Sequence, residues 1–202
     1  MSNDEKIFHT RTERRDAAEN RQRILDAAFK LFEQNGVEQV SMNQIATEAQ
    51  IGPGTLYRRY RNKGEICLDL IKDNIVLFFE DIESYLEETR GESPSIRFKE
   101  VLGLFIRFRE NKAQLLKGVE DSESSHTGKQ LKISPMFQEL HQIFLGLFEE
   151  MRVNESSRIN IVFKTDMLLQ ALRSDFYLFQ REVRGYSPEM ILDQIYSTFI
   201  SY

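Results

Sequence analysis

The chain of 202 residues has little cysteine, proline or glycine and no long apolar run. Cys67 is the single cysteine, which excludes an intramolecular disulfide and a cysteine-based metal cluster. Apolar runs stay far below the length of about 18 residues that a membrane helix needs. The N-terminus is charged, unlike that of a signal peptide. We therefore expect a cytoplasmic protein without a membrane partner.

Four prolines and ten glycines are few for this length, and their scarcity favours long, uninterrupted helices. Hydrophobic residues make up 41% of the chain and 15 residues are Phe, which is enough for a packed core rather than a disordered chain. The apolar pattern follows a helical period throughout and nowhere indicates a strand. We predict an all-α protein with two domains, residues 1–65 and 66–202.

The sequence also lacks the motifs of the common enzyme classes. It contains no GxSxG elbow, no P-loop, no HExxH and no glycine-rich dinucleotide fingerprint. The three histidines, His9, His126 and His141, are too scattered to indicate a metal site. His141 lies on an apolar stripe between Phe137 and Phe144, where it is either a core histidine or a polar anchor in a pocket. We expect no catalytic residue, no metal and no cofactor.

The net charge of −5 is unevenly distributed. Residues 1–65 carry 11 Lys and Arg against 10 Asp and Glu, a net charge of +1. The remainder carries 16 against 22, a net charge of −6, and the two parts sum to −5. Because a nucleic-acid footprint is local, an acidic chain with a basic cluster can still bind DNA.

Apolar periodicity and capping signals predict the order of the helices. Residues 1–10 are expected to be loosely ordered and residues 120–132 to form a polar loop. Ser-Pro pairs at 93–94, 134–135 and 187–188 mark helix starts, and Gly185 marks a stop. The expected helices cover 11–35, about 42–49, 53–60, 63–88, a segment from 94 with a break near Asn111, a segment from 135, 155–184 and 188–199.

The stretch 41–66, SMNQIATEAQIGPGTLYRRYRNKGEI, reads as two short helices joined by a tight turn. Ser41 followed by Gln44 is the signature of a capping box at the start of the first helix. Gly52 and Pro53 mark the start of the second helix, since Pro is tolerated at the first helical position. Leu56 and Tyr60, four residues apart, anchor the inner side of this second helix.

The outer side of the second helix carries hydroxyl and basic side chains: Thr55, Tyr57, Arg58, Arg59, Arg61 and Lys63. No acidic residue occurs between Ile51 and Gly64. A helix-turn-helix that reads DNA needs small residues for close approach, followed by groups that bind phosphates and base edges. The alternative is an ordinary corner between two helices with a solvated basic face.

These residues resemble the DNA-binding domain of the TetR family of transcriptional regulators. The resemblance covers about residues 20–66 and rests on Asn35-Gly36, Ile45-Ala46, Ala49, the run Gly54-Thr55-Leu56-Tyr57, Tyr60 and Lys63. Gln50 stands where family members usually have a turn glycine, so the turn either avoids positive φ or accepts strain. Tyr60 replaces the usual Phe and adds a hydroxyl that needs water or another partner.

The resemblance implies a dimeric regulator with three sites. One contacts a double-stranded DNA operator through Ser41, Gly54, Thr55, Tyr57, Arg58, Arg59 and Lys63. A second binds a small hydrophobic effector among Phe105, Phe108, Leu116, Phe137, His141, Phe144, Phe163 and Met167. The third joins two copies through the last two helices, with Leu169, Leu172, Phe176, Phe179, Ile191, Ile195 and Phe199.

The effector expected from this lining is neutral or weakly charged, because no cluster of Arg or Lys falls on these apolar faces. The resemblance favours a repressor that is released from its operator by the effector. Two other functions stay open at this point. One is a co-regulator or interaction subunit of the same fold that does not bind DNA, and the other is an enzyme on a helical scaffold.

Overall fold

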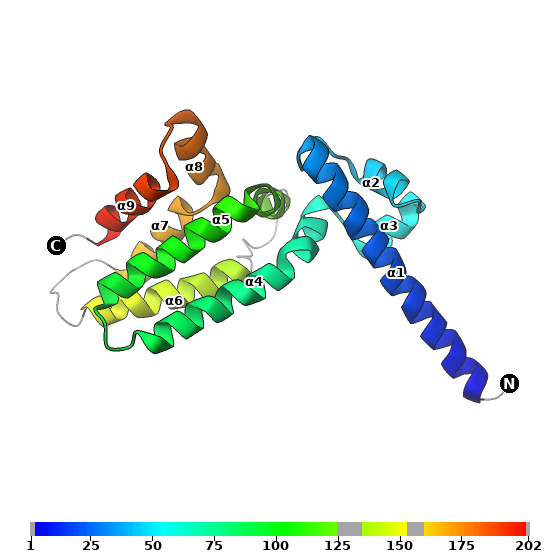
Figure 1. Cartoon of the computed structure of the whole chain (residues 1–202), viewed down its shortest axis with the longest axis horizontal. Coiled ribbons are helices and arrows are strands. Elements are labelled where there is room, and N and C mark those ends of the chain that lie inside the picture. Colours follow the sequence, from blue (N-terminus) through cyan, green and yellow to red (C-terminus); the bar gives the residue numbers. More distant parts are fainter. Residues whose placement is uncertain (1–2, 125–134, 153–159, 201–202) are drawn as a thin grey trace.

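The computed structural model describes residues 3–124, 135–152 and 160–200, and all regular structure within these ranges is helical. This confirms the predicted all-α class (Figure 1). The elements in chain order are α1 (Asn3–Asn35), α2 (Met42–Glu48), α3 (Pro53–Arg59), α4 (Lys63–Glu88), α5 (Pro94–Ser124), α6 (Pro135–Arg152), α7 (Ile161–Ala171), α8 (Ser174–Leu178), the π-helical turn η1 (Phe179–Val183) and α9 (Pro188–Phe199).

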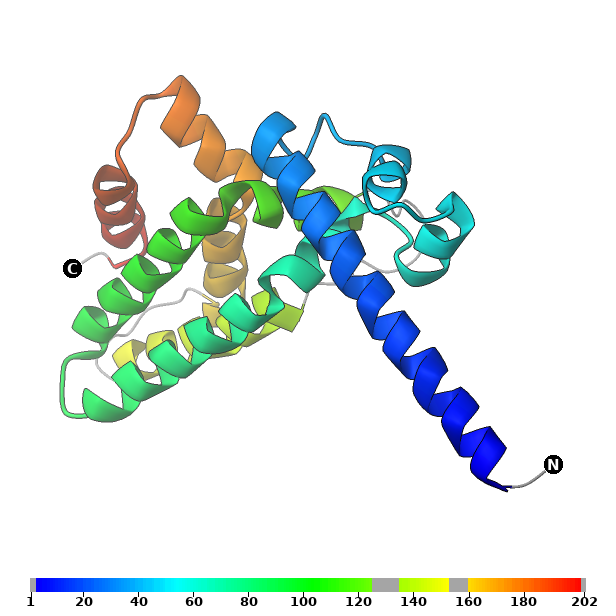
Figure 2. The same cartoon turned by 45° about the vertical axis from the view of Figure 1, so that its right-hand side comes forward.

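The buried apolar side chains form two clusters. The N-terminal core takes its members from α1, α2, α3 and the first turns of α4, ending at Cys67. The C-terminal core begins at Ile71 in α4 and includes α5 to α9. Leu115 and Val119 of α5 pack against both cores. Helix α4 therefore passes from one core into the other, and α5 contacts both (Figures 1 and 2).

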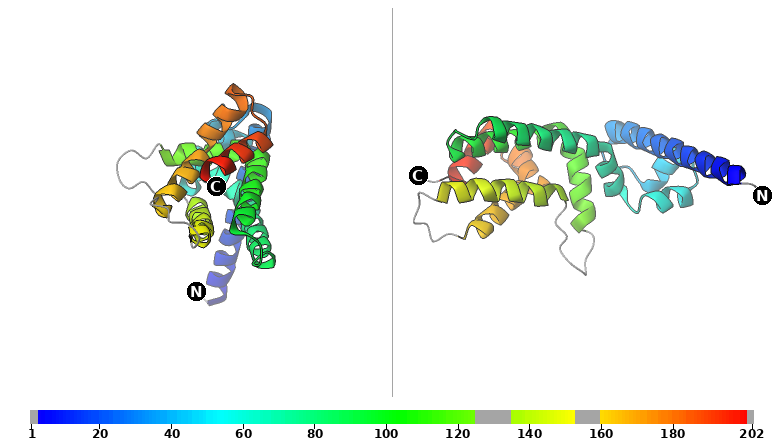
Figure 3. Two further views of the ribbon diagram at one scale, coloured as in Figure 1. Left: turned by 90° about the vertical axis from the view of Figure 1, so that its left-hand side faces the viewer. Right: turned by 90° about the horizontal axis from the view of Figure 1, so that it is seen from below.

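Helix α1 is longer than predicted, because it begins at Asn3 rather than near Arg11. The sequence contains no glycine or proline before Asn35, so nothing in the first ten residues stops a helix. Residues 3–10, which were expected to be loosely ordered, are therefore helical. The first half of α1 extends away from the rest of the protein, and the N-terminal end lies at one extremity of the molecule (Figure 3).

Helix α5 bends where a break was predicted. Lys112 has non-helical backbone angles (φ −130°, ψ 18°), one residue after the predicted position, Asn111. The helix then continues to Ser124, so the first part of the predicted polar loop, residues 120–124, is helical. Residues 125–132 of that loop lie outside the described residues.

The single helix predicted over residues 155–184 is instead three elements, α7, α8 and η1. The chain leaves the helical conformation at Arg173, whose backbone is extended (φ −69°, ψ 152°). Ser174 then directs its backbone N–H to the buried carboxylate of Glu120 at 2.9 Å. This long-range hydrogen bond favours a new helix start at a position where the local sequence gives no stop signal. Residues 153–159 lie outside the described residues.

Candidate DNA-binding site and effector domain

Helix α2 begins with the predicted capping box. The backbone N–H of Gln44 donates to Ser41 Oγ at 3.2 Å, and the Ser41 backbone N–H donates to Gln44 Oε1 at 2.7 Å. Two N–H groups that the helix cannot satisfy are thus satisfied at its start. Met42, Ile45 and Ala46 face the N-terminal core, which fixes α2 against α1.

The turn between α2 and α3 accepts strain. Gln50 has φ +54°, the left-handed conformation that favours glycine. Arg23 of α1 stabilises the turn, because its Nη2 donates to the carbonyl oxygens of Ala49 at 2.6 Å and Gln50 at 2.9 Å. The sequence left open whether this turn avoids a positive φ at Gln50 or accepts strain there. The structure has the strained turn.

Helix α3 begins with Gly52 as its N-cap and Pro53 at its first position, as predicted. Leu56 and Tyr60 are buried and hold its inner face. The outer face is open, because a Cβ placed on Gly52 or Gly54 would have no atom within 4 Å. Another molecule can therefore approach the start of α3 closely.

The candidate DNA-binding side chains do not all point to this outer face. Tyr57 is half-exposed, and Arg58 is exposed with its Nη2 3.3 Å from Thr55 Oγ1. Arg59 turns back toward α1, where its Nη1 donates to the Ala17 carbonyl at 3.3 Å. The guanidinium of Arg59 also lies 5.9 Å from the centre of the Tyr60 ring.

Lys63 contacts the segment between α1 and α2. Its Nζ donates to the carbonyl oxygens of Val37 at 2.6 Å and Glu38 at 3.0 Å. Ser41 is exposed at the start of α2. The structure thus leaves Ser41, Gly54, Thr55, Tyr57 and Arg58 accessible at α2 and α3, whereas Lys63 and Arg59 bind backbone carbonyls.

The additional hydroxyl of Tyr60 has a partner. Its Oη donates to Asp69 Oδ2 at 2.5 Å. Arg21 binds the same carboxylate through two nitrogens, at 2.8 and 2.6 Å, and Lys72 approaches it at 3.2 Å. The hydrogen bond from Arg21 holds the pKa of Asp69 well below its usual range. This cluster joins α1, the end of α3 and α4.

The eight candidate effector residues differ in their burial. Five of them, Phe105, Phe108, Leu116, Phe137 and Phe144, are buried in the C-terminal core. Phe163 and Met167 of α7 are 62% and 48% exposed, so these two side chains lie apart from the core that buries the other five. Apolar side chains of α7 lie on both its buried and its exposed sides. The periodicity of the sequence alone does not show which of them face the core.

His141 is partly buried, with 16% of its side chain exposed. Its Nε2 is 3.2 Å from Asp166 Oδ1 of α7. The two residues line a shallow cleft of about 530 Å³ between the start of α6 and α7. The proximity of Asp166 gives His141 a polar partner.

The candidate dimer residues also separate into two groups. Leu169, Leu172, Ile191 and Ile195 are buried in the core of their own protomer, which leaves little of their surface for a second copy. Phe199 packs against the same core. Phe176 and Phe179 are about half-exposed. The neighbouring Val183, Tyr186 and Met190 are exposed as well and were not predicted.

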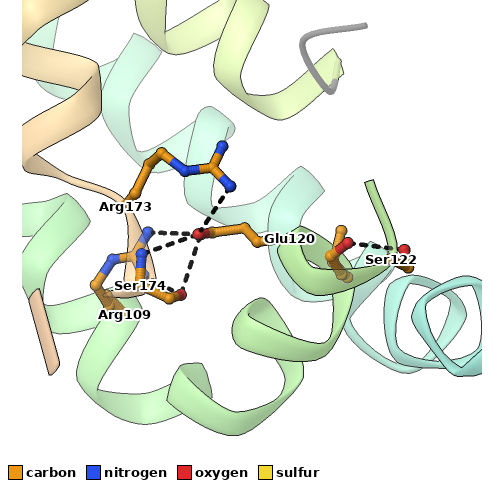
Figure 4. A network of polar contacts seen from close by, with 6 residues as sticks. Arg109, Glu120, Ser122, Arg173 and Ser174 are labelled. Atoms are coloured by element: carbon orange, nitrogen blue, oxygen red, sulfur yellow. Dashed lines mark hydrogen bonds and ion pairs between the residues drawn. The ribbon is translucent and has the colours of Figure 1, made fainter. Parts of the chain in front are cut away.

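A buried polar cluster in the C-terminal domain was missed by sequence reasoning (Figure 4). Arg109 of α5 is 1% exposed, and its Nη2 donates to Glu120 Oε1 at 3.1 Å. Its Nη1 donates to Ser174 Oγ at 2.5 Å, and that hydroxyl donates to Glu120 Oε1 at 3.1 Å. Arg173 approaches the same carboxylate at 3.8 Å.

Burial lowers the pKa of Arg109, and the Glu120 carboxylate opposes this effect. The Arg109 guanidinium lies 5.1 Å from the centre of the Phe105 ring. Arg109 therefore places one buried cation beside the aromatic core, and Glu120 compensates its charge. No local signal identifies this pair, since both residues lie in charged stretches that resemble solvated helix faces.

A larger cleft, of about 960 Å³, separates the two parts of the protein. One wall is the segment 35–39 between α1 and α2 together with residues 62–64, and the other is the second half of α5. Leu178 and Glu182 contribute from α8 and η1. Mixed charges and amides line this cleft, in contrast to the aromatic core of the C-terminal domain.

Two absences hold for residues 3–124, 135–152 and 160–200. Among those residues, no helix is both long and apolar enough to cross a membrane. The same residues contain no group of three or more His, Cys, Asp or Glu side chains that could hold a metal ion.

Comparison with known proteins gives consistent results. The family model of bacterial regulatory proteins of the tetR family matches residues 24–70. The HTH-type transcriptional regulator SAB2452 of Staphylococcus aureus (strain bovine RF122 / ET3-1) is 33% identical over 187 residues, which cover 93% of this chain and 96% of that protein. The regulator SAR2658 of strain MRSA252 has the same identity and coverage.

Solved structures show the same fold. FadR of Thermus thermophilus, a TetR-family repressor in complex with lauroyl-CoA, has a TM-score of 0.63 at 16% identity, covering 89% of this chain and 92% of its own. FadR of Bacillus subtilis in complex with stearoyl-CoA has a TM-score of 0.62 at 19% identity, covering 89% and 97%. Together with the capped α2, the open face of α3 and the helical second domain, these findings show that the chain is a DNA-binding transcriptional regulator of the TetR family.

Proposed function

We propose that this regulator binds a two-fold-symmetric DNA operator as a homodimer, and that a small lipophilic effector releases it, so that it acts as a repressor. The observation that carries the proposal is the outer face of α3. Thr55, Tyr57 and Arg58 lie there beside Gly52 and Gly54, which have open space around them. The absence of acidic residues between 51 and 64 removes repulsion from phosphates.

In this proposal α3 enters the major groove. Ser41, Gly54, Thr55 and Tyr57 contact the backbone, and Arg58 reaches base edges, since Arg binds guanine through two hydrogen bonds. Arg59 and Lys63 contribute only if DNA phosphates replace their present carbonyl partners. For Lys63 the salt slope tests this exchange. Lys63→Ala lowers the slope by about one unit if the lysine contacts a phosphate, and leaves it unchanged otherwise.

The alternative is a co-regulator that keeps the fold without binding DNA. A gel shift with random and genomic DNA over a range of salt concentrations separates the two functions. A DNA-binding regulator gives binding that weakens steeply with salt, plus a subset of genomic fragments that it retains at higher salt. A protein that binds neither class of DNA at low salt contradicts the proposal.

The dimer is proposed to form through the exposed apolar side chains of the last elements of the chain. This dimer surface consists of Phe176, Phe179, Val183, Tyr186 and Met190. These five exposed apolar side chains fall within a short segment of the chain, residues 176–190, and grouped apolar exposure is typical of an interaction surface. Two recognition helices related by a two-fold axis read half-sites about 34–36 Å apart, one helical turn of DNA.

The effector is proposed to bind among the aromatic side chains between α4, α5 and α6. Phe78 stacks on Phe108 with ring centres 4.6 Å apart, and Phe105 lies 6.1 Å from Phe78. An aromatic lining suits a flat or lipophilic molecule. The two FadR proteins of similar fold hold acyl-CoA molecules. Because Glu120 already compensates Arg109, a neutral or weakly charged effector fits this region better than a multiply charged one.

Linkage makes this part of the proposal testable. A ligand that prefers the DNA-incompetent state lowers operator affinity by the same factor by which the operator lowers ligand affinity, typically about 5–150-fold. A thermal-shift screen of lipophilic compounds identifies ligands, and operator affinity is then measured with each. Compounds that stabilise the protein while leaving operator affinity unchanged contradict the release mechanism.

A further inference from the structure

The first turns of α4 and the last turns of α5 approach each other unusually closely, and two glycines make this possible. A Cβ on Gly118 would lie 2.7 Å from Cys67 Sγ and 3.0 Å from Val37 Cγ1. A Cβ on Gly64 would lie 2.0 Å from Ser122 Oγ and 2.9 Å from the Gly118 carbonyl oxygen. A side chain larger than a hydrogen atom at Gly118 or Gly64 would therefore require the helices to move apart.

The crossing lies between the two parts of the protein. Gly64 and Cys67 belong to the end of the DNA-binding domain, and Cys67 is completely buried. Leu115 and Val119, on either side of Gly118, pack against both hydrophobic cores. A change in the distance between α4 and α5 at this crossing would therefore affect both the DNA-binding domain and the effector domain.

Polar contacts hold the end of α5 on both sides of the crossing. Lys117 forms an ion pair with Glu38, in the segment between α1 and α2. Glu120, two residues after Gly118, is fixed to Ser174 and Arg109 of the effector domain. Because α5 is held at Lys117 and Glu120 in this way, it cannot absorb an extra methyl group by sliding freely, so the DNA-binding domain has to tilt or shift instead.

We propose that Gly118 and Gly64 are positioning residues, which set the angle between the two domains and so the operator spacing that the protein prefers. This inference rests on the proposed binding of a two-fold operator. A base-pair step is about 3.4 Å along the duplex, and half-sites about 10 base pairs apart lie on one face of it. A small displacement at the crossing, repeated in both protomers, therefore changes which half-site spacing fits. Packed interfaces transmit such shifts because they are not continuously deformable.

The test uses the full chain with Gly118→Ala, and Gly146→Ala as a matched control. Gly146 is also a helical glycine, in α6, but a Cβ there would have no atom within 4 Å. Both changes alter helix propensity equally. The operator is first selected from sheared genomic DNA with the parent protein. Affinity is then measured for this operator, for versions with one base pair added or removed between the half-sites, and for random DNA.

We expect Gly118→Ala to lose about tenfold in affinity on the selected operator, which is about 1.4 kcal/mol, and to lose less on one of the altered spacings. Gly146→Ala should bind all of these DNAs like the parent. Binding to random DNA should change little, because that binding does not depend on spacing. Thermal unfolding of both variants shows whether the fold is kept.

A second substitution keeps the inference falsifiable if Gly118→Ala folds poorly. Cys67→Ala removes the sulfur nearest to the added methyl group, so the double variant Cys67→Ala/Gly118→Ala should recover the parent's spacing preference. Two results overturn the positioning role. One is a folded Gly118→Ala protein with the parent's affinity and spacing preference. The other is a loss that is equal on every DNA and is not restored by Cys67→Ala. A parent protein that binds no DNA would instead contradict the proposed function itself, and this inference with it.

Discussion

The Tyr60 hydroxyl donates to Asp69 Oδ2 at 2.5 Å and thereby ties the end of the recognition helix to α4. Arg21 of α1 binds the same carboxylate from the other side. Three helices of the DNA-binding domain therefore meet at one acidic side chain. Tyr60 replaces a residue that is usually Phe in the family, so this chain has a polar connection at a position where packing alone is common.

The first prediction concerns the pH dependence of Asp69→Asn. The hydrogen bond from Arg21 lowers the pKa of Asp69 in the folded state below its unfolded value of about 3.9. The carboxylate therefore contributes stability that is fully present above that value and is lost as the pH falls toward the folded pKa. In urea unfolding, Asp69→Asn should be less stable than the parent from pH 5 to 8, and the difference should shrink below about pH 4. A difference that stays constant down to pH 2 would contradict the role of ionised Asp69.

The second prediction tests the recognition helix. Arg58→Ala should cost about 1–3 kcal/mol of operator binding and relax specificity at one position in each half-site. Fluorescence anisotropy with single-base variants of the operator measures both effects. Arg90→Ala, at the end of α4 distant from α3, is the matched control, since Arg90 pairs only at the surface with Glu87 among the described contacts. Equal binding by the two variants would show that Arg58 does not contact bases.

The third prediction tests the dimer surface. Val183 is 68% exposed in the protomer, so Val183→Asp leaves the fold intact but buries a charge if two copies associate there. Sedimentation should show a dimer for the parent and a folded monomer for this variant. Val76→Asp, at an exposed position of α4, is the control and should stay dimeric. Leu172→Asp should unfold the protein instead, because Leu172 is buried in its own protomer.

The fourth prediction concerns the buried pair of Arg109 and Glu120. Glu120→Ala leaves the Arg109 charge buried without its carboxylate and should cost about 3–5 kcal/mol of folding free energy. Replacing both residues, as in Arg109→Met/Glu120→Ala, should recover part of the loss, because the uncompensated charge is removed as well. Glu87→Ala, which breaks an ion pair with Arg90 in which both side chains are exposed, should cost about 1 kcal/mol or less. Urea unfolding compares the three variants.

The fifth prediction uses the single cysteine. Burial raises the pKa of Cys67 to about 12, so very little thiolate exists at pH 8. The folded protein should react with a thiol reagent at least a hundredfold more slowly than the urea-unfolded protein, since the thiolate is the reactive form and burial also blocks access. Rapid labelling in the absence of denaturant would mean that the contact between Cys67 and Gly118 opens readily.

Local signals were sufficient to predict most helix boundaries. Ser41 with Gln44 and Gly52 with Pro53 start α2 and α3, and Gly185 adopts the expected left-handed conformation (φ +70°). Each of these signals acts between residues that are close in sequence, so the chain itself carries the information.

The positions of the effector and dimer residues could not be predicted in the same way. A helical period shows that Leu172 and Phe176 are apolar, but not that one faces its own core and the other solvent. The break between α7 and α8 depends on Glu120, 54 residues earlier in the chain, and no local pattern contains such a contact. The DNA-binding role of individual side chains stays a prediction for the same reason, because it depends on a partner molecule.

The two hydrophobic cores also have a consequence for how the protein unfolds. Each core can open as a cooperative unit, and Leu115 and Val119 are the side chains through which the loss of one weakens the other. Amide hydrogens in α1 and α2 should therefore exchange with solvent through a partial opening that leaves α5 and α6 protected. The DNA-binding domain can then sample open states on its own, while the C-terminal core stays folded.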